Sequence, residues 1–373
     1  MKLAVVVLAA GQSTRMKSQQ PKVLHRLAGK PMITYSVETA GQLGVGKPVL
    51  VVGCGMEQVQ ETVGDAAEYV VQEERLGTGH AVLQARSLLE GHCDAVLVYY
   101  GDMPLLTMET LQRLLTLHAE GRGPIAMLTL LANDPRGFGR VVRDADGRVR
   151  AIVEEVDCTP EQLAIRELNA GVYCFDALWL WEHLPRLSLS RKGEYYLTDT
   201  VGMAVAEGAE VAAVSIDNEA ECLGINTRVH LAEAEKVLRQ RINQRCMLDG
   251  VTLVDPETIY IDATVGIGQD TVIYPNTHLR GETRIGRQCT IGPNCLLVDT
   301  AVGDHCEIKV SVCEQALLED GVDVGPFAHL HKGAHLARGM HMGNLGKVQN
   351  SYRVKRKQTE KTETSSVTST SVQ

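Results

Sequence analysis

The sequence has few aromatic residues, no zinc-type cysteine spacing and no apolar run long enough to cross a membrane, and each absence excludes a class of protein. Aromatic residues make up 4% of the 373 residues, which disfavours the base-stacking surfaces of proteins that bind single-stranded nucleic acids. The ten cysteines form no CxxC pair and no Cys/His zinc pattern, and scattered thiols are typical of a reducing compartment. We therefore expect a cytoplasmic protein whose partners are neither membranes nor nucleic acids.

Two common phosphate-binding patterns are also missing. The first apolar run is followed neither by the GxGxxG fingerprint of dinucleotide-binding proteins nor by the GxxxxGK[ST] loop. The formal net charge of −9 argues against a polyanion as the main partner, so any phosphate site must be a local basic feature. The length allows two domains, and the 44% hydrophobic content supports ordinary buried cores.

A loop of small and polar residues is the first feature that carries chemistry. The run Leu3–Leu8 predicts a buried parallel strand, and Gly11 at its end lets backbone N–H groups approach an anion. Residues 12–14 add hydrogen-bond donors, and the cations Arg15 and Lys22 follow. The stretch predicts a phosphate-binding loop, although taken alone it fits an ordinary solvated turn about equally well.

Strands and helices are expected to alternate along the next part of the chain. Apolar runs predict strands at Pro48–Gly53, Tyr69–Gln72 and Ala95–Tyr100. Helical spacing of apolar residues predicts helices at Pro31–Leu43, Glu57–Val63 and Gly79–Leu89. This alternation predicts an α/β fold with a mostly parallel sheet and helices on both faces. Because ligands of such sheets bind at the carboxyl ends of the strands, the residues after each strand are candidates for the site.

The second strand end offers a nucleotide-binding loop. Gln72 and Thr78 can pair with the edge of a base, and Gly77 and Gly79 give the backbone between them conformational freedom. We expect this loop to lie beside the phosphate-binding loop, because parallel strands end at the same edge of a sheet.

The third strand end carries the sharpest single candidate, Asp102, which follows Tyr100 and Gly101. Mg²⁺ prefers one or two carboxylates together with phosphate oxygens of a substrate, and an aspartate beside a phosphate loop supplies that arrangement. The alternative is a turn aspartate before the helix expected at Met108–His118. The two other strand ends favour the metal-binding interpretation.

Glu154 and Asn169 are candidates for sugar recognition. Glu154 follows an expected strand at Val149–Val153, and Asn169 lies inside another at Glu167–Tyr173. A carboxylate can bridge vicinal hydroxyls and an amide can hold an N-acetyl group, although both residues also fit ordinary positions beside hairpins.

Several motifs resemble those of a known enzyme family. The opening signature of the nucleotide-sugar pyrophosphorylases, L-A-A-G-x-x-T-R-M-x(n)-P-K, is present as Leu8, Ala9, Ala10, Gly11, Thr14, Arg15, Met16, Pro21 and Lys22. Up to about Arg228 the chain is similar to the uridylyltransferase half of the bifunctional bacterial N-acetylglucosamine-1-phosphate uridylyltransferases/glucosamine-1-phosphate acetyltransferases. The segments that carry this likeness are Gly137–Arg140, Ile152–Glu154, Glu167–Gly171, Gly193–Asp199 and Gly224–Arg228.

The resemblance implies a Mg²⁺-dependent transferase that makes UDP-N-acetylglucosamine and pyrophosphate from UTP and N-acetylglucosamine 1-phosphate. It implies catalytic roles for Arg15 and Lys22, and Mg²⁺ ligands at Asp102 and Asn226. The residues that it brings against the substrates are Leu8, Ala9, Ala10, Gly11, Lys22, Gln72, Gly77, Thr78, Tyr100, Gly101, Asp102, Gly139, Glu154, Asn169 and Asn226. Two positions depart from the family pattern: Ala170 replaces a common Thr or Ser, and Ser13 replaces a common glycine.

A six-residue period dominates the last part of the chain. Glycines often follow the repeated aliphatic residue, and the phase slips once around Val302 and Ile308. The pattern predicts a hexapeptide-repeat β-helix in which one aliphatic residue per strand stacks inside. The expected inward residues are Ile261, Ile267, Ile273, Leu279, Ile285, Ile291, Leu297, Val302, Ile308, Val312, Leu318, Val324, Leu330, Leu336 and Met342, and Cys289 and Cys295 are expected to stack as small residues.

Four parts are therefore expected. Residues 1–228 form a Rossmann-like uridylyltransferase domain, 229–247 a linker helix, 248–344 a truncated left-handed parallel β-helix, and 345–373 a disordered Ser/Thr/Lys-rich tail. The resemblance implies a homotrimer formed through the β-helix. It also implies an acetyltransferase site in later coils, and His331 stands where an arginine is expected. We accordingly expect acetyltransferase activity to be absent, with truncation or a frameshift near codon 345 as its origin.

Two other functions remain open. The chain could act on another sugar 1-phosphate or nucleotide, since related transferases share the opening signature, although Glu154, Asn169 and the β-helix argue against this. It could also be a catalytically inactive assembly or regulatory subunit, which the intact set of strand-end residues makes the weaker option.

Overall fold

The computed structural model describes residues 1–11, 14–53, 55–121, 123–343 and 347–348, and the chain divides into two compact units between Ile242 and Asn243. Helix α9 (Arg228–Leu248) crosses this division and corresponds to the expected linker helix. Among the described helices, none combines the length and the apolar character that a membrane span requires.

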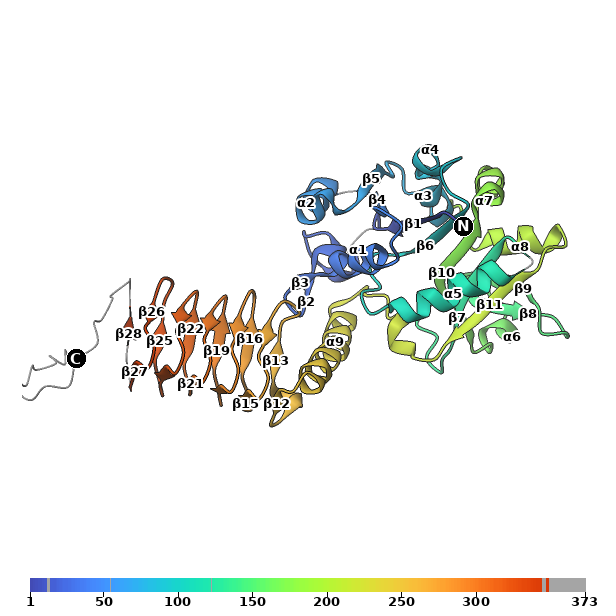
Figure 1. Cartoon of the computed structure of the whole chain (residues 1–373). Helices are drawn as coiled ribbons and strands as arrows, with labels where there is room; N and C mark the ends of the chain where they lie inside the picture. The colour runs from blue at the N-terminus through green and yellow to red at the C-terminus, as the bar shows by residue number, and fades with distance from the viewer. Residues whose placement is uncertain (12–13, 54, 122, 344–346, 349–373) are drawn as a thin grey trace, which may run out of the picture. The chain divides into compact units, whose positions relative to one another are not determined.

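A nine-stranded sheet forms the centre of the first unit (Figure 1). Its main path is β11-β7-β10-β6-β1-β4-β5, and β8 and β9 form a hairpin beside β10. Strand β1 is parallel to both β4 and β6, whereas β10 is antiparallel to β6 and β7. The strands are β1 (Leu3–Leu8), β4 (Val49–Val52), β5 (Glu68–Val71), β6 (Ala95–Tyr100), β7 (Ile125–Leu131), β8 (Arg140–Arg143), β9 (Val149–Val153), β10 (Glu167–Asp176) and β11 (Val211–Ile216), with a separate pair β2 (Arg26–Leu27) and β3 (Lys30–Pro31).

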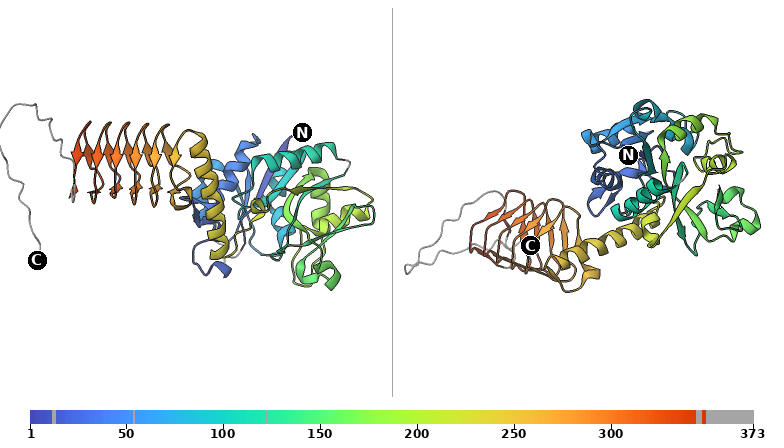
Figure 2. Two further views of the ribbon diagram at one scale, coloured as in Figure 1. Left: turned by 90° about the horizontal axis from the view of Figure 1, so that it is seen from below. Right: turned by 45° about the vertical axis from the view of Figure 1, so that its right-hand side comes forward.

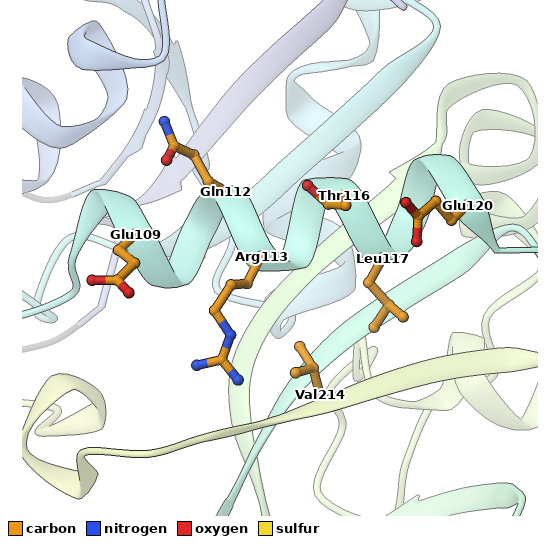
Figure 3. Close-up of a pocket in the computed structure, with 7 residues that line it drawn as sticks. All are labelled: Glu109, Gln112, Arg113, Thr116, Leu117, Glu120 and Val214. Atoms are coloured by element: carbon orange, nitrogen blue, oxygen red, sulfur yellow. The ribbon is translucent and has the colours of Figure 1, made fainter.

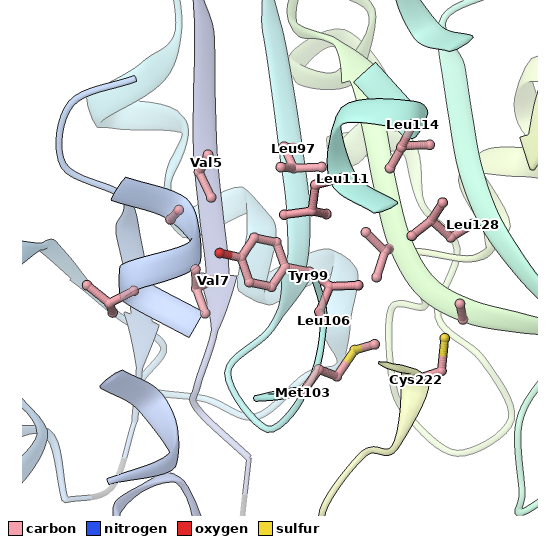
Figure 4. Packing of buried hydrophobic residues seen from close by; sticks show 14 of the residues in the cluster. Val5, Val7, Leu97, Tyr99, Met103, Leu106, Leu111, Leu114, Leu128 and Cys222 are labelled. Carbon is pink, nitrogen blue, oxygen red and sulfur yellow. The ribbon is translucent and has the colours of Figure 1, made fainter. Parts of the chain in front are cut away.

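Helices bury both faces of the sheet, as the alternation of side chains in β1 requires. Val5 and Val7 pack in one cluster with residues of α1 (Met32–Gln42), α2 (Met56–Val63) and α5 (Met108–Glu120), as Figure 4 shows for α5. Val6 and Leu8 pack in a second cluster with residues of α3 (Thr78–Gln84), α7 (Ala177–His183) and α8 (Asp199–Ala206). The mostly parallel α/β domain predicted from the sequence is confirmed.

One segment that was predicted as a single helix forms two helices in the structure. Residues Gly79–Leu89 were predicted as a single helix, but α3 ends at Gln84 and α4 (Arg86–Leu89) begins two residues later. The N–H of Ala85 donates to the carbonyl of Val82, only three residues back, and this tightened turn separates the two helices. The one remaining short α-helix of the described first unit is α6 (Pro160–Leu163).

The second unit is a left-handed parallel β-helix, whose stacked coils Figure 2 shows in side view. Each strand pairs in parallel with the third strand after it, which gives three sheets. The strands are β12 (Thr252–Leu253), β13 (Tyr260–Ile261), β14 (Gly266–Ile267), β15 (Val272–Ile273), β16 (His278–Arg280), β17 (Arg284–Ile285), β18 (Thr290–Ile291), β19 (Leu296–Val298), β20 (Ala301–Val302), β21 (Glu307–Ile308), β22 (Val312–Glu314), β23 (Leu317–Leu318), β24 (Asp323–Val324), β25 (His329–Leu330), β26 (His335–Leu336), β27 (His341–Met342) and β28 (Lys347–Val348).

The interior of the β-helix follows the predicted period except at one position. Cys313, rather than Val312, is fully buried and pairs in register with Leu297 and Leu330. Ile308, Cys313 and Leu318 are five positions apart instead of six, so a six-residue period counted back from Leu318 reaches Val312, one position too early. Cys289 and Cys295 are both buried, so the prediction that they stack inside is confirmed.

Parallel pairing continues past the expected end of the repeats. Strand β28 pairs with β25, so that Lys347 lies opposite His329 and Val348 opposite Leu330. The remaining residues of the expected tail lie outside the described part of the chain.

Candidate active site

The ends of adjacent parallel strands meet at one edge of the sheet. The N–H of Gly101 donates to Leu8 O at 2.9 Å, and the N–H of Ala9 donates to Val51 O at 2.8 Å. The N–H of Gln72 donates to Val52 O at 2.8 Å. The residues after β1, β5 and β6 therefore lie side by side, as the sequence predicts.

The phosphate loop is described only in part. Ala10 is buried against the sheet, whereas Gly11 is exposed at the start of the loop. Gln12 and Ser13 and the side chain of Thr14 lie outside the described residues, so the predicted donors of this segment stay a prediction. Arg15 and Lys22, which follow the loop, are both described.

Four polar side chains from three separate segments converge beyond the strand ends. Asn226 Oδ1 accepts hydrogen bonds from Lys22 Nζ at 2.9 Å and from Arg15 Nη2 at 3.0 Å. The Lys22 ammonium also forms an ion pair with the Asp102 carboxylate. The Lys22 and Asp102 side chains are 12% and 15% exposed, so water and salt screen this pair less than they would a surface pair.

The backbone explains how these segments come together. The N–H of Ile225 donates to Asp102 O at 3.0 Å, which joins the turn before α9 directly to the end of β6. Lys22 begins a short 3₁₀ turn whose next residues, Val23 and Leu24, are buried in the first hydrophobic cluster. Because the backbone that carries these side chains is held in place, they can move only by changing rotamer.

The proposed nucleotide loop is folded against a later segment. Gln72 is 5% exposed, and its Nε2 donates to Gly77 O at 2.9 Å. Thr78 Oγ1 accepts from the N–H of Leu197 at 3.0 Å, and the N–H of Tyr195 donates to Leu76 O at 2.7 Å. Two backbone segments more than a hundred residues apart therefore build one wall of the site.

The structure leaves no room for a side chain at Gly77. Its φ is +98°, and a Cβ atom would lie 2.6 Å from Tyr195 O and 2.8 Å from Tyr195 N. We expect Gly77→Ala to destabilise the fold by about 2 kcal/mol or more and to raise the KM for the nucleotide, because strain and clash both fall in the loop. Gly147→Ala is the matched control, since Gly147 has φ +79° but open space around its Cβ position. Urea unfolding and nucleotide titrations measure both effects, and equal stability loss in the two variants would contradict the predicted clash.

The residues predicted to bind the sugar, Asn169 and Glu154, lie on β10 and directly after β9, respectively. Asn169 is 7% exposed, and its Oδ1 accepts from the Tyr173 hydroxyl at 2.8 Å and from the N–H of Gly171 at 3.0 Å. The N–H of Asn169 donates to Gly139 O at 2.9 Å, which joins two of the predicted sugar residues. The Thr198 hydroxyl donates to Glu154 Oε1 at 3.0 Å.

No role was predicted for Thr198, Tyr195 or Tyr173. Thr198 and Tyr173 each donate a hydrogen bond to a predicted site residue, and Tyr195 contacts the nucleotide loop through its backbone. Thr198 and Tyr195 belong to the segment Gly193–Asp199, whose likeness to the family was visible without indicating what it contacts. Tyr173 gave no signal of its own, because its hydrogen bond to Asn169 depends on a bulge in β10. Tyr100 was predicted, and the ring of this residue lies where a Cβ atom on Gly171 would stand.

Burial raises the pKa of Glu154, with the nearby charges of Asp199 and Asp157 adding to the effect. The Thr198 hydrogen bond favours the charged carboxylate but is outweighed. Since the folded-state pKa lies above the ordinary value of 4.5, the folded protein binds this proton more tightly than the unfolded chain does. The resulting stabilisation is complete below the unfolded pKa and is lost as the pH rises through the folded pKa.

We therefore expect the wild type to lose stability relative to Glu154→Gln as the pH rises above about 4.5. Chemical unfolding of both proteins across a pH series measures this difference in slope. Glu109→Gln, a change at an exposed glutamate, is the control and should leave the slope as in the wild type. Parallel curves for wild type and Glu154→Gln would refute the raised pKa.

A separate surface hollow of about 430 Å³ lies along α5 (Figure 3). Its lining is Glu109, Gln112, Arg113, Thr116, Leu117, Glu120 and Val214. Within the part of the chain that the structure describes, no predicted site residue lines it. The hollow is therefore distinct from the candidate site.

Known proteins resemble this chain in both units. Residues 5–157 match a MobA-like NTP transferase domain, and residues 264–298 match the bacterial transferase hexapeptide (six repeats). The bifunctional protein GlmU of Geobacillus sp. (strain WCH70) is 45% identical over 347 residues, which cover 93% of this chain and 76% of that protein. The bifunctional protein GlmU of Trichlorobacter lovleyi is 47% identical over 346 residues, or 92% of this chain and 75% of that protein.

Proteins of this nucleotidyltransferase type are generally metal-dependent, and they act on a nucleotide and a sugar phosphate. The bifunctional protein GlmU of Heliobacterium modesticaldum is 44% identical over 351 residues, again over most of this chain (94%) and of its own length (77%). The likeness thus runs through both the nucleotidyltransferase sheet and the β-helix. The chain belongs to the GlmU family and is a UDP-N-acetylglucosamine pyrophosphorylase.

Proposed function

We propose that UTP and N-acetylglucosamine 1-phosphate react at the carboxyl ends of β1, β5 and β6, where Lys22, Asp102 and Asn226 meet. The observation that carries this proposal is the convergence of the Asp102 carboxylate and Asn226 Oδ1 on the ammonium of Lys22. Two oxygen atoms that already share one positive charge form a cation site, and a nearby lysine is suited to hold phosphate.

Mg²⁺ is the metal that these donors fit. A carboxylate and an amide oxygen are hard ligands, and Mg²⁺ binds through one or two carboxylates while it keeps waters and phosphate oxygens. Asp102 and Asn226 would hold the ion in the position that the Lys22 ammonium has in this structure. When bound, Mg²⁺ supplies neutralisation of the negative charge on the reacting phosphates.

The transfer needs charge neutralisation more than proton removal. A phosphate oxygen of the sugar phosphate bonds to the α-phosphorus of UTP, and the bond from that phosphorus to pyrophosphate breaks. Since the second pKa of a phosphate monoester is about 6, this oxygen is already an anion near neutral pH. The protein therefore has to align the two phosphates and stabilise the charge that develops on the leaving pyrophosphate.

Lys22 and Arg15 supply the positive charge for this task. Both cations donate to Asn226 Oδ1, so two positive groups lie close to one atom of the site. Their mutual repulsion favours binding of an anion between them. We propose that Lys22 turns from the Asp102 carboxylate toward the triphosphate when UTP binds.

The side-chain amides of Gln72 and Asn169 can recognise uracil and the N-acetyl group, respectively. The described hydrogen bonds of the Gln72 amide use Nε2, which leaves its Oε1 as an acceptor for the ring N–H of uracil. Those of Asn169 use Oδ1, which leaves its Nδ2 as a donor to the N-acetyl carbonyl. Glu154, held by Thr198, can accept hydrogen bonds from sugar hydroxyls.

Replacement of Asn226 tests the metal site separately from the fold. We expect Asn226→Ala to raise the Mg²⁺ concentration for half-maximal activity about ten-fold or more, because one of two protein ligands is lost. Asn133→Ala, at an exposed turn, is the control and should match the wild type. Pyrophosphate release over a Mg²⁺ series measures the shift, and an unchanged half-saturation point would remove Asn226 from the metal site.

The same family membership supports a proposal on assembly and location. We propose a homotrimer formed through the β-helix and a cytoplasmic location, the latter supported by free thiols at all of the described cysteines. The absence of acetyltransferase activity stays a prediction, and enzyme-dependent thiol release from acetyl-CoA with glucosamine 1-phosphate would overturn it.

A further inference from the structure

We propose that Glu314, His329 and His331 bind one divalent transition-metal ion, of which Zn²⁺ fits the donors best. One potential ligand atom of each residue lies within 4.8 Å of the other two. Across the residues that the structure describes, no second group of three His, Cys, Asp or Glu side chains meets this criterion. All three residues belong to the β-helix, so this site is different from the one at Asp102 and Asn226.

The backbone register brings the three side chains together. His329 and Leu330 form β25, and His331 follows them, so the two histidines project from the same face at the two-residue period of a strand. Strand β25 pairs in parallel with β22, where Leu330 lies opposite Cys313. The next position of that register puts Glu314 beside His331.

Direct contacts support a shared ion. His329 Nε2 lies 2.9 Å from Glu314 Oε2, and the ring centroids of His329 and His331 are 3.8 Å apart at a tilt of 41°. Both rings and the Glu314 carboxylate therefore lie within reach of one ion.

The Nε2 atom of His331 is the second observation that supports an ion at this site. This atom is buried, and no hydrogen-bond partner for it exists among the described groups. A buried nitrogen of this kind needs an explanation, and an ion or a water is the usual one. The nearby carboxylate favours a cation.

His335 and His341 provide a comparison within the same molecule. Three histidines spaced six residues apart begin successive strands, and each contacts a carboxylate from the preceding coil at 2.8–2.9 Å. The pairs are His329–Glu314, His335–Glu319 and His341–Asp323. Across the described residues, the first pair alone has a second histidine close enough to make a three-ligand set. The other two pairs are surface contacts between one histidine and one carboxylate, which contribute little.

The donors select the class of metal. Two imidazole nitrogens and one carboxylate oxygen suit Zn²⁺, Co²⁺, Ni²⁺ or Cu²⁺, whereas Mg²⁺ and Ca²⁺ prefer oxygen alone. Tetrahedral Zn²⁺ with ligands at about 2.0–2.1 Å requires ligand atoms roughly 3.3 Å apart. His329 and Glu314 have side chains 42% and 47% exposed, so they can rotate to close the larger gaps. The three protein ligands leave a fourth position for water.

Zinc titration of the metal-free full chain tests this site. Bound Zn²⁺ is counted after gel filtration, with its affinity measured against a chromophoric chelator in excess Mg²⁺. We expect the wild type to bind one more equivalent than His331→Gln, or to bind that equivalent at least ten-fold more tightly. His335→Gln and His341→Gln each break a two-residue pair and should retain the wild-type stoichiometry.

A Co²⁺ spectrum distinguishes this site from the cysteines. Visible d–d bands without a thiolate charge-transfer band are expected in the wild type, and these bands should disappear in His331→Gln. Uridylyltransferase activity should be equal in both proteins, which shows that the variant is folded. Equal Zn²⁺ binding by wild type and folded His331→Gln, or a spectrum dominated by thiolate bands, would overturn the proposal.

Discussion

Replacing Asp102 by alanine is expected to lower kcat for UDP-N-acetylglucosamine formation about 10³-fold while the fold remains intact. The side chain is 15% exposed, follows the end of β6 and forms an ion pair with Lys22. Its loss removes the single carboxylate from the proposed metal site and breaks the ion pair with the Lys22 ammonium. Both changes weaken charge neutralisation at the reacting phosphates.

Two controls separate chemistry from structure in this experiment. Asp102→Asn keeps the shape of the side chain but removes its charge, and it should be nearly as inactive as Asp102→Ala. Asp217→Ala breaks an exposed ion pair with Arg113 and should retain wild-type activity. Near-normal Mg²⁺-dependent turnover by Asp102→Ala would refute the metal role of this residue.

Lys22→Ala is expected to cost about 2–4 kcal/mol of transition-state stabilisation, which corresponds to a loss of roughly 30-fold to 10³-fold in kcat/KM. The physical reason is that the Lys22 ammonium is held by Asp102 and Asn226 at the edge where the triphosphate is proposed to bind. Steady-state kinetics with UTP as the varied substrate measure the loss.

The matched control for Lys22 is Lys47→Ala, because Lys47 is an exposed lysine of the same unit. It should leave kcat/KM unchanged. A Lys22→Ala protein with the thermal stability of the wild type but less than a three-fold loss would show that Lys22 is not part of the charge-neutralising machinery. Lys22→Arg should recover only part of the activity, since a planar guanidinium does not reproduce a compact ammonium.

Much of the site could be predicted because parallel strands share one edge. The apolar runs that end before Ala9, Gln72 and Gly101 gave the strands, and a parallel sheet necessarily brings their ends together. The repeated aliphatic residues of the β-helix were equally easy to predict, since one inward residue per short strand leaves a period of six over most of the repeat. These features depend on local pattern alone.

The contacts that complete the site could not be predicted from local pattern. Asn226 meets Arg15 across 211 positions of sequence, and its role was suggested only by resemblance. The hydrogen bonds of Thr198 and Tyr173 depend on how the antiparallel β10 and its neighbours fold back beside β6. Cys313 was missed because a coil side one residue short shifts the period without any glycine or proline to mark it.

The proposed reaction is measured directly as pyrophosphate release from UTP with N-acetylglucosamine 1-phosphate and Mg²⁺. Parallel reactions use glucose 1-phosphate in place of the sugar phosphate and dTTP in place of UTP. We expect rapid release with the first pair and at least ten-fold slower release with either substitute. Equal rates with glucose 1-phosphate, or no release with any pair by protein shown to be folded, would contradict it.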